Sequence, residues 1–256
     1  MRLDPRLADF RPAPDFLEGR VVLVTGAGDG IGRAVACTCA AHSATVVLLG
    51  RTVEKLERVY DSIRSAGGPE PAIYPMDLSG AMPPDYEALA TRMESEFDRL
   101  DGLVHNAALL GDLGPIEHYS PEGWQELIQV NVNAPFLLTR ALVPLVRRTA
   151  AEHGHASVIF TSSGVGRRGR AYWGGYSVSK FAIEGLNQVL ADELDGAAGV
   201  RVNSLNPGPV RTRMRAKAFP AEDPETLITP EEVARAWLWL LDARDVHGEA
   251  LDAQIP

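Results

Sequence analysis

Residues 20 to 32 read RVVLVTGAGDGIG, a short apolar run that passes directly into a glycine-rich turn. The run is typical of a buried strand that needs helices on both faces of its sheet, and residues 33 to 42 after the turn have helical character. Gly26, Gly30 and Gly32 suit a loop in which the backbone bends sharply, approaches a pyrophosphate closely and packs a helix against a strand. The same glycines are equally compatible with a plain tight connection, so the rest of the chain must decide.

The rest of the chain alternates between apolar runs and helical stretches. Further strands are expected at 45–49, 72–76, 102–105, 157–161, 200–205 and 249–253, and helices at 53–66, 86–100, 121–146, 176–194 and 230–241. This alternation predicts a Rossmann-type, doubly wound α/β fold with a parallel sheet of about seven strands and helices on both faces. We expect an N-terminal arm over residues 1–18 and one domain over 19–256, with a charged, irregular candidate lid at about 211–229. Ligands of such a sheet bind at the carboxyl ends of its strands.

The composition is that of a globular protein with one sizeable core. The chain has 256 residues, 45% of them hydrophobic and 23% charged, and its formal charge of -9 argues against a nucleic-acid-binding surface. Cys37 and Cys39 lie two residues apart on an expected helix and face nearly opposite sides, so they form neither a disulfide nor a metal site. No uncharged apolar run approaches ~18 residues. We therefore expect a cytoplasmic protein without metal, nucleic-acid or membrane partners.

Candidate chemistry is concentrated in the stretch from 161 to 180, TSSGVGRRGRAYWGGYSVSK. Ser163 follows the end of an expected strand, and Tyr176 and Lys180 are four residues apart, which places them one turn apart on one face of a helix. A phenol titrates near ~10 in water and a nearby cation favours its phenolate, so we expect Lys180 to lower the pKa of Tyr176. The plainer alternative is a core tyrosine and a solvated lysine on an ordinary helix.

The second expected strand ends in Gly50 and Arg51. A site specific for NAD has a carboxylate here to bind the ribose 2′-hydroxyl, whereas Gly50 leaves room and Arg51 can bind the 2′-phosphate of NADP. Asp29 in the glycine turn opposes this preference by its charge, but it can turn into water or cap the helix that begins at Gly30. Alternatively, Arg51 is a surface residue that begins the next helix.

Three other strand ends carry groups that suit a bound dinucleotide. Asp77 can cap the segment that follows it or accept a hydrogen bond from an adenine amino group. Small residues after Asn106 let the backbone pass close to a cofactor, and Pro207-Gly208-Pro209 forces a rigid turn with the hydroxyl of Thr212 just beyond it. Asn131 and Asn133 are unexpected in the middle of an apolar helical stretch, which raises the question of what they bind.

Taken together, the motifs are TGAGDGIG at 25–32, HNAA at 105–108, Asn131, Ser163, Tyr176 with Lys180, and Pro207-Gly208. This combination resembles that of the short-chain dehydrogenase/reductase family, in its compact single-domain branch, over roughly residues 18 to 254. The phrases HNAALLGD, QVNVNAPF and MRAKAFPAEDP are similar to those of the YciK-like oxidoreductases within that family.

The resemblance implies an oxidoreductase that interconverts a small-molecule carbonyl and an alcohol by hydride transfer. Gly50 and Arg51 predict that NADP(H) is preferred over NAD(H), since Asp29 can turn outward or cap the helix. The resemblance implies that Tyr176 is the acid–base group, that Lys180 contacts the nicotinamide ribose, that Ser163 binds the substrate oxygen and that Asn131 organises a water for proton relay. The cofactor contacts that it implies are Gly26, Gly28, Asp29, Gly30, Ile31, Arg51, Asp77, Leu78, Asn106, Ala107, Tyr176, Lys180, Pro207, Gly208, Val210 and Thr212.

The resemblance also implies a homodimer or homotetramer, and the expected helix 176–194 is apolar on more than one face. Two residues depart from the family pattern: Ala108 stands where glycine is common, and Asp29 stands where NADP-dependent members often have a basic residue. Two other functions remain open, a cofactor-binding sensor or scaffold without turnover and an epimerase or dehydratase on the same fold. The complete catalytic set disfavours the sensor or scaffold.

The sequence does not name the substrate. Apolar residues that could line its pocket, or simply pack, are Leu109, Leu110, Tyr172, Trp173 and Phe219. Seven cations could ring the entrance and steer an anionic substrate: Arg167, Arg168, Arg170, Arg211, Arg213, Arg215 and Lys217. The alternative is that these are solvated loop residues, some of them paired with Glu222 and Asp223.

Overall fold

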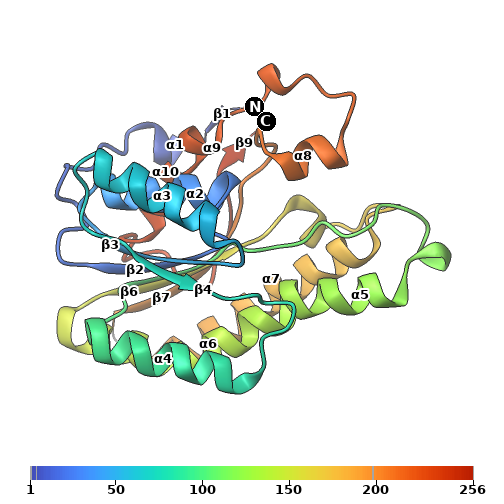
Figure 1. The fold of residues 1–256 in the computed structure, drawn as a ribbon. Helices are drawn as coiled ribbons and strands as arrows, with labels where there is room; N and C mark the ends of the chain where they lie inside the picture. Colours follow the sequence, from blue (N-terminus) through green and yellow to red (C-terminus); the bar gives the residue numbers. More distant parts are fainter. Residues whose placement is uncertain (1, 4, 198, 256) are drawn as a thin grey trace.

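A sheet of seven parallel strands lies at the centre of the computed structural model, which describes residues 2–3, 5–197 and 199–255. In spatial order the strands are β4 (Ala72–Pro75), β3 (Thr45–Gly50), β2 (Val21–Thr25), β5 (Gly102–His105), β6 (Ala156–Thr161), β7 (Val200–Asn206) and β8 (Ala250–Asp252). The strand order reverses between β2 and β5, so the loops after these two strands diverge at the carboxyl edge of the sheet. The Rossmann-type fold predicted from the sequence is confirmed (Figure 1).

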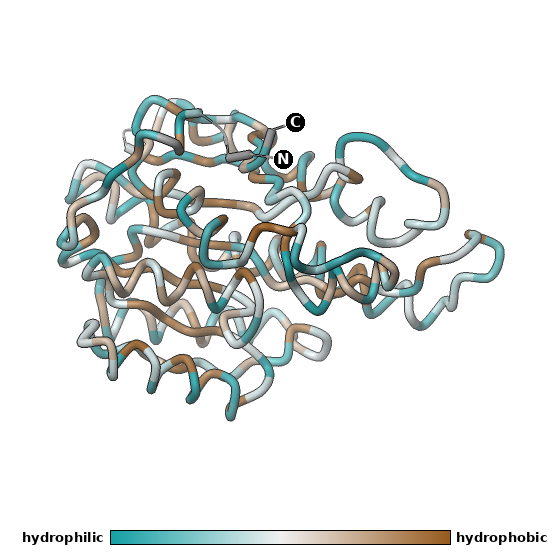
Figure 2. The backbone as a smooth tube through the Cα atoms, turned by 90° about the horizontal axis from the view of Figure 1, so that it is seen from above, coloured by the Kyte–Doolittle hydropathy of each residue, from teal (hydrophilic) through white to brown (hydrophobic). Residues whose placement is uncertain are grey.

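Helices cover both faces of the sheet (Figure 1). One face carries α2 (Gly30–Ala41), α3 (Val53–Ser65) and α10 (Arg235–Leu240), and the other carries α4 (Pro83–Phe97), α6 (Ala134–His153) and α7 (Gly174–Leu194). Every residue of β2, β5 and β6 is buried, which explains why these strands are apolar on both faces rather than alternating. Figure 2 shows the apolar strands running through the interior, with hydrophilic residues on the outer turns. Within the described chain, no helix has the length and apolar character needed to cross a bilayer.

Two helices differ from the sequence prediction in ways that matter for the site. The helix expected at 86–100 begins at Pro83, because the carboxylate of Asp85 accepts a hydrogen bond from the backbone N of Met82 and caps the first turn. The single helix expected at 121–146 is three segments, α5 (Pro121–Ile128), a π-helical turn η2 (Gln129–Asn133) and α6. The extra residue of a π-turn leaves the apolar pattern almost unchanged, so the sequence did not reveal it.

The segment expected to be an irregular lid contains a short helix, α8 (Arg213–Ala218), and a 3₁₀ turn, η4 (Pro224–Thr226). Thr212 caps α8, since its hydroxyl accepts a hydrogen bond from the N of Arg215. The helix expected at 230–241 is likewise divided, into α9 (Pro230–Val233) and α10.

The N-terminal arm is held against the domain. Its strand β1 (Arg2–Leu3) pairs antiparallel with β9 (Gln254–Ile255), so the two ends of the described chain lie side by side (Figure 1). Helix α1 (Pro5–Ala8) follows, and the side chains of Leu7 and Leu17 are buried in the core beneath α2 and α10. Residues 1 and 4 of the expected arm, and residues 198 and 256 of the expected domain, lie outside the described residues.

A buried carboxylate fixes the amino-terminal edge of the sheet, opposite the edge expected to bind ligands. Asp101, 3% exposed, accepts a hydrogen bond from the N of Val21 at 2.8 Å and two from the guanidinium of Arg99 at 2.6 and 2.8 Å. The carboxylate therefore joins the start of β2 to the segment that leads into β5.

We expect Asp101→Asn to lower the free energy of unfolding by about 1 to 3 kcal/mol, because the amide keeps the shape but loses the charge-assisted bonds to Arg99. Urea denaturation measures the change. Asp98→Asn is the matched control, since Asp98 is an exposed carboxylate whose pair with Arg148 lies on the surface, and we expect it to cost less than about 1 kcal/mol. Equal losses in the two variants would contradict the role given to Asp101.

Candidate active site

A cavity of about 460 Å³ runs along the carboxyl edge of the sheet, from the glycine turn after β2 to the loop after β7. Every catalytic and cofactor residue proposed from the sequence lines this cavity, with the exception of Asn131. Ligand sites of parallel sheets form at this edge because the strand ends and the helix N-termini converge there.

The glycine turn is shaped for close backbone approach. Gly26 has φ 67°, and a Cβ at that position would lie 3.0 Å from Cα of Ala107. A Cβ on Gly32 would collide with the carbonyl oxygen of Gly26. The hydroxyl of Thr25, which the sequence analysis did not single out, accepts hydrogen bonds from N of Asn106 at 2.9 Å and N of Ala107 at 3.0 Å. The loops after β2 and β5 are thereby joined into one backbone cradle that suits a pyrophosphate.

Asp29 caps α2, one of the two orientations expected from the sequence. Its carboxylate accepts a hydrogen bond from N of Gly30 at 2.8 Å and pairs with Nζ of Lys55 at 2.7 Å and with the guanidinium of Arg213 at 3.5 Å. The hydrogen bond from Lys55 is the largest of the effects that lower the pKa of Asp29. Lys55 was missed because only the packing of α3 against the turn brings it there; a Cβ on Gly28 would lie 2.9 Å from Cβ of Lys55.

Arg51 is exposed and lines the cavity beside Asp77. Burial acts to raise the pKa of Asp77, but hydrogen bonds from Ser79 and the charge of Arg51 outweigh it, so that this pKa lies below its ordinary value. Asp77 Oδ1 accepts from N and Oγ of Ser79 at 3.0 and 2.8 Å. The carboxylate thus caps the segment that follows β4, and Arg51 contributes its positive charge at the cavity wall.

Tyr176 and Lys180 lie one turn apart on α7 and are 7% and 3% exposed. Burial raises the pKa of Tyr176 to about 12, although a hydrogen bond with Ser163 acts in the opposite direction. Burial lowers the pKa of Lys180 to about 8, and the charge of Glu184 acts to raise it. Nζ of Lys180 donates to the carbonyl oxygen of Thr161 at 2.7 Å and lies 5.6 Å from the centre of the Tyr176 ring.

The sequence-based expectation that the pKa of Tyr176 lies below its ordinary value is therefore wrong for this structure, in which burial raises it. Desolvation of the phenol dominates, and the ammonium is directed at Thr161 rather than at the phenol oxygen. The spacing of the two residues predicted their shared helix face but could not give their burial.

Asn131 lies on the π-helical turn η2, is 1% exposed and does not line the cavity. Its Oδ1 accepts from N of Leu109 at 2.7 Å, and its Nδ2 donates to the carbonyl oxygen of Leu109 at 2.8 Å and to Oγ of Ser179 at 3.0 Å. The side chain therefore joins the loop after β5 to α7. Asn133, in contrast, is exposed and bonds only with Gln129 among the described residues.

The cavity wall beyond Tyr176 is apolar and includes Leu109, Leu110, Trp173 and Met214. Two of the expected lining residues do not reach it: Tyr172 is 64% exposed, and Phe219 packs against Trp173 with ring centres 5.7 Å apart.

Of the seven cations expected around the entrance, Arg213 and Arg215 line the cavity, and both pair with carboxylates of the protein. Arg167 turns away to pair with Glu184 and Asp252, Arg211 pairs with Glu225, and Arg215 pairs with Glu222 at 2.6 Å. Arg170 lies over the rings of Trp173 and Phe219. Most of these cations thus have partners within the protein, which agrees with the alternative that they are loop residues and not a binding surface.

The cavity has the features that a dinucleotide requires. Besides the backbone cradle, it contains the hydroxyl of Thr161, which is buried at the cavity wall and has no hydrogen-bond partner among the described residues. A buried hydroxyl without a hydrogen bond is unfavourable unless a bound ligand supplies the missing partner. The residues present therefore fit a nicotinamide dinucleotide.

Comparison with known proteins agrees with this geometry. The family model described as short chain dehydrogenase matches residues 20–223. The protein named Uncharacterized oxidoreductase YciK, from Escherichia coli K12, is 49% identical over 247 residues, which are 96% of this chain and 96% of that protein. Two solved short chain dehydrogenases, from Shigella flexneri 2a in complex with NADP and from Escherichia coli CFT073 in complex with NADPH, are 48% and 49% identical. Both have a TM-score of 0.91, and both comparisons cover 95% of this chain and 100% of the other.

Proposed function

The chain belongs to the short chain dehydrogenase family, and from this premise we propose that it interconverts a carbonyl and an alcohol with NADP(H), using Tyr176 as the acid–base group. One observation carries the proposal: Ser163, Tyr176 and Lys180 line the same cavity as the glycine turn. The cofactor, when bound, supplies or accepts the hydride. The chain itself must bind the cofactor, orient the substrate and move one proton.

Tyr176 suits this proton transfer because its pKa of about 12 keeps the phenol protonated at neutral pH. Ser163 forms a hydrogen bond with it, so both hydroxyls are available to one substrate oxygen. Lys180, with a pKa of about 8, carries a positive charge at pH 7 and favours the negative charge that develops on the phenol oxygen as the proton leaves. In the oxidation of an alcohol the direction reverses, and the deprotonated phenol oxygen of Tyr176 accepts the proton of the substrate hydroxyl.

We propose that NADP(H) is preferred over NAD(H). The glycine turn from Gly26 to Ile31 would hold the pyrophosphate, and Arg51 would bind the 2′-phosphate with charge-assisted hydrogen bonds. The repulsion expected from Asp29 is weakened, because Lys55 and Arg213 already pair with that carboxylate. The complexes of two relatives with NADP and NADPH support the binding of this cofactor.

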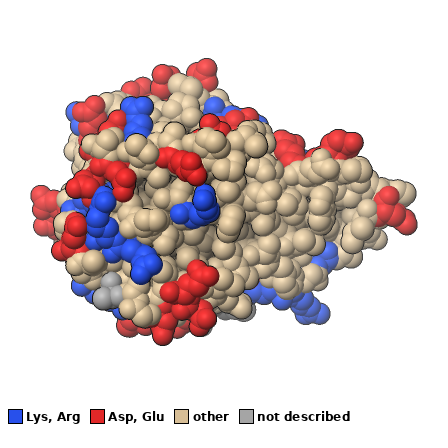
Figure 3. Space-filling view, turned by 90° about the horizontal axis from the view of Figure 1, so that it is seen from below, with Lys and Arg blue, Asp and Glu red and all other residues tan. Residues whose placement is uncertain are grey.

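We further propose a homodimer or homotetramer, on the basis of an apolar stripe on α7. Val178, Phe181 and Val189, at successive spacings of three and eight residues, lie on one helix face and are 47%, 45% and 56% exposed, whereas Ile183 and Leu190 are buried in the core. Figure 3 views the side where α4, α6 and α7 lie and shows charges gathered at one end beside a broad area without charged side chains. Exposed apolar surface of this kind favours a protein partner.

A cytoplasmic location is also proposed. Cys37 and Cys39 are both unpaired on α2, which is usual in a reducing compartment.

Replacing Tyr176 by phenylalanine removes only the hydroxyl that moves the proton. We expect Tyr176→Phe to lower turnover by at least about 100-fold and to leave the dissociation constant of NADPH within about twofold. The assay follows NADPH absorbance with a panel of aldehydes, cyclic ketones, quinones and β-ketoacyl thioesters. Tyr60→Phe is the control and should behave as wild type, because it removes a hydroxyl on α3 that donates to the carboxylate of Glu70, away from the cavity. Turnover of Tyr176→Phe near the wild-type rate would refute the acid–base role.

Replacing Arg51 by alanine tests the cofactor preference. Each charge-assisted hydrogen bond is worth about 1.5 to 3 kcal/mol, so we expect the affinity for NADPH to fall by at least about tenfold while that for NADH stays unchanged. Fluorescence titration with both reduced cofactors measures this. Arg58→Ala, on the following helix α3, where the guanidinium of Arg58 donates to the backbone carbonyl of Glu54, should alter neither affinity. Equal affinities of the wild type for the two cofactors would show that the preference is wrong.

Light scattering during gel filtration tests the assembly. We expect a dimer or tetramer at micromolar concentration, and we expect Val189→Glu to dissociate it, because the charge would be buried in the interface. Val53→Glu, which places the same charge at a 39% exposed apolar residue of α3 on the opposite face of the sheet, should leave the assembly unchanged. A monomeric wild-type protein would contradict the proposal.

A further inference from the structure

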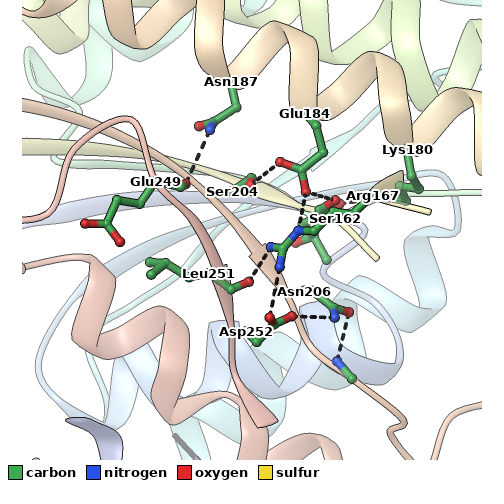
Figure 4. A network of polar contacts seen from close by, with 12 residues as sticks. Ser162, Arg167, Lys180, Glu184, Asn187, Ser204, Asn206, Glu249, Leu251 and Asp252 are labelled. Atoms are coloured by element: carbon green, nitrogen blue, oxygen red, sulfur yellow. Dashed lines mark hydrogen bonds and ion pairs between the residues drawn. The ribbon is translucent and has the colours of Figure 1, made fainter. Parts of the chain in front are cut away.

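A buried carboxylate, Glu184, lies on α7 one turn beyond Lys180 and is 6% exposed (Figure 4). One of its oxygens accepts hydrogen bonds from Oγ of Ser162 at 2.5 Å and Nε of Arg167 at 3.2 Å, and the other accepts from Oγ of Ser204 at 2.6 Å. All three contacts use the carboxylate as an acceptor, as its ionised form requires. The residue was not singled out from the sequence, since helical spacing alone does not show what a side chain meets in the core.

The network continues from Arg167 to the last strand of the sheet. The guanidinium donates to Asp252 at 2.9 Å and to the carbonyl oxygen of Leu251 at 2.7 Å. The other oxygen of Asp252 accepts from Nδ2 of Asn206 at 2.7 Å, and Oδ1 of Asn206 accepts from N of Gly208 at 3.1 Å. Hydrogen bonds therefore connect the helix of Lys180 to the loop after β7 without interruption (Figure 4).

Each end of this network is adjacent in the chain to a residue of the candidate active site. Ser162 precedes Ser163, Glu184 follows Lys180 by one helical turn, and Asn206 precedes the turn at Pro207. The short 3₁₀ turn η3 (Gly164–Gly166), which carries Arg167 at its end, is packed tightly on Lys180. A Cβ on Gly166 would lie 2.8 Å from Cβ of Lys180.

We propose that Glu184 is a positioning residue, which holds Ser163, Lys180 and the Pro207–Gly208 turn in one fixed arrangement and whose negative charge sustains the ammonium form of Lys180. The catalytic part of this inference rests on the proposed function. The electrostatic part does not, because it concerns the chain alone.

The charged and titratable groups of the network around Lys180 lie on three elements. Tyr176 and Glu184 lie on α7, Arg167 follows η3, and Asp252 on β8 lies beyond Arg167. Burial alone lowers the pKa of Lys180, and Glu184 is the charge that opposes this. Without that charge the ammonium should lose its proton at a lower pH, nearer to neutrality.

The titration of Lys180 can be observed directly, because the chain has three lysines, Lys55, Lys180 and Lys217. We would label lysine with ¹³C at Cε and follow the three signals by NMR between pH 6 and about 11, assigning them with Lys55→Arg and Lys217→Arg. In Glu184→Gln we expect the midpoint of Lys180 to fall by at least about one pH unit relative to wild type. An unchanged midpoint would overturn the proposal.

Asp101→Asn is the matched control, since it neutralises another buried carboxylate paired with an arginine, at the opposite edge of the sheet. It should destabilise the fold without moving the Lys180 midpoint. A shift of the same size in Asp101→Asn would show that the Lys180 midpoint responds to any loss of stability of the fold, and it would also overturn the proposal.

Arg167→Met provides a second test that does not depend on the folding of Glu184→Gln. It removes a positive charge and the link to Asp252 but keeps Glu184, so we expect the Lys180 midpoint to rise rather than fall, and turnover to drop by about tenfold. A fall in the midpoint would refute the role of Glu184.

Kinetics complete the experiment. For any carbonyl that the wild type reduces, Glu184→Gln should lower kcat more than it changes the KM for NADPH, and the alkaline limb of kcat/KM should move to lower pH with the NMR midpoint. A wild type without turnover would contradict the proposed function while leaving the NMR result intact. An NMR midpoint that does not move, with turnover present, would contradict only the role of Glu184.

Discussion

Keeping a charge on a buried lysine is the constraint on which the site depends. Removing an ammonium from water costs on the order of several kcal/mol unless acceptors and opposite charge surround it. The carbonyl of Thr161 supplies an acceptor to Lys180, and Glu184 supplies the opposite charge. Glu184 is itself buried and needs Arg167, which in turn pairs with Asp252. Charges of alternating sign thus extend from the cavity wall to the last strand of the sheet, and each one limits the freedom of the element that carries it.

The parts of the site that could be predicted are those set by covalent order and by regular periodicity. In a parallel sheet every strand ends at the same edge, so apolar runs followed by Gly26, Asp77, Asn106 or Ser163 place these residues around one cavity before any contact is known. A four-residue spacing fixes two side chains on one helix face, as it does for Tyr176 and Lys180. The doubly wound fold follows from the same alternation of strands and helices.

The parts that could not be predicted depend on how elements dock. Lys55 meets Asp29 only because α3 packs against the glycine turn, and Arg167 leaves the cavity only because the η3 turn directs it towards Glu184. The pKa of Tyr176 was predicted in the wrong direction for a related reason. Burial raises this pKa, and burial depends on the folded interior rather than on the spacing to a lysine. The π-helical turn that contains Asn131 adds one residue to the helix but hardly changes the spacing of its apolar residues, so the sequence did not predict it.

The loop after β7 is fixed by residues that follow almost all of the site in the chain. Nε2 of Gln254 donates to the carbonyl oxygens of Pro207 and Pro209 at 2.7 and 2.9 Å, and Asp252 completes the pairing of Arg167. During translation, the glycine turn and the Tyr176 helix emerge from the ribosome well before these partners exist. A chain interrupted a few residues before Asp252 would therefore contain every proposed catalytic group and still lack the contacts that hold the turn at Pro207 in place.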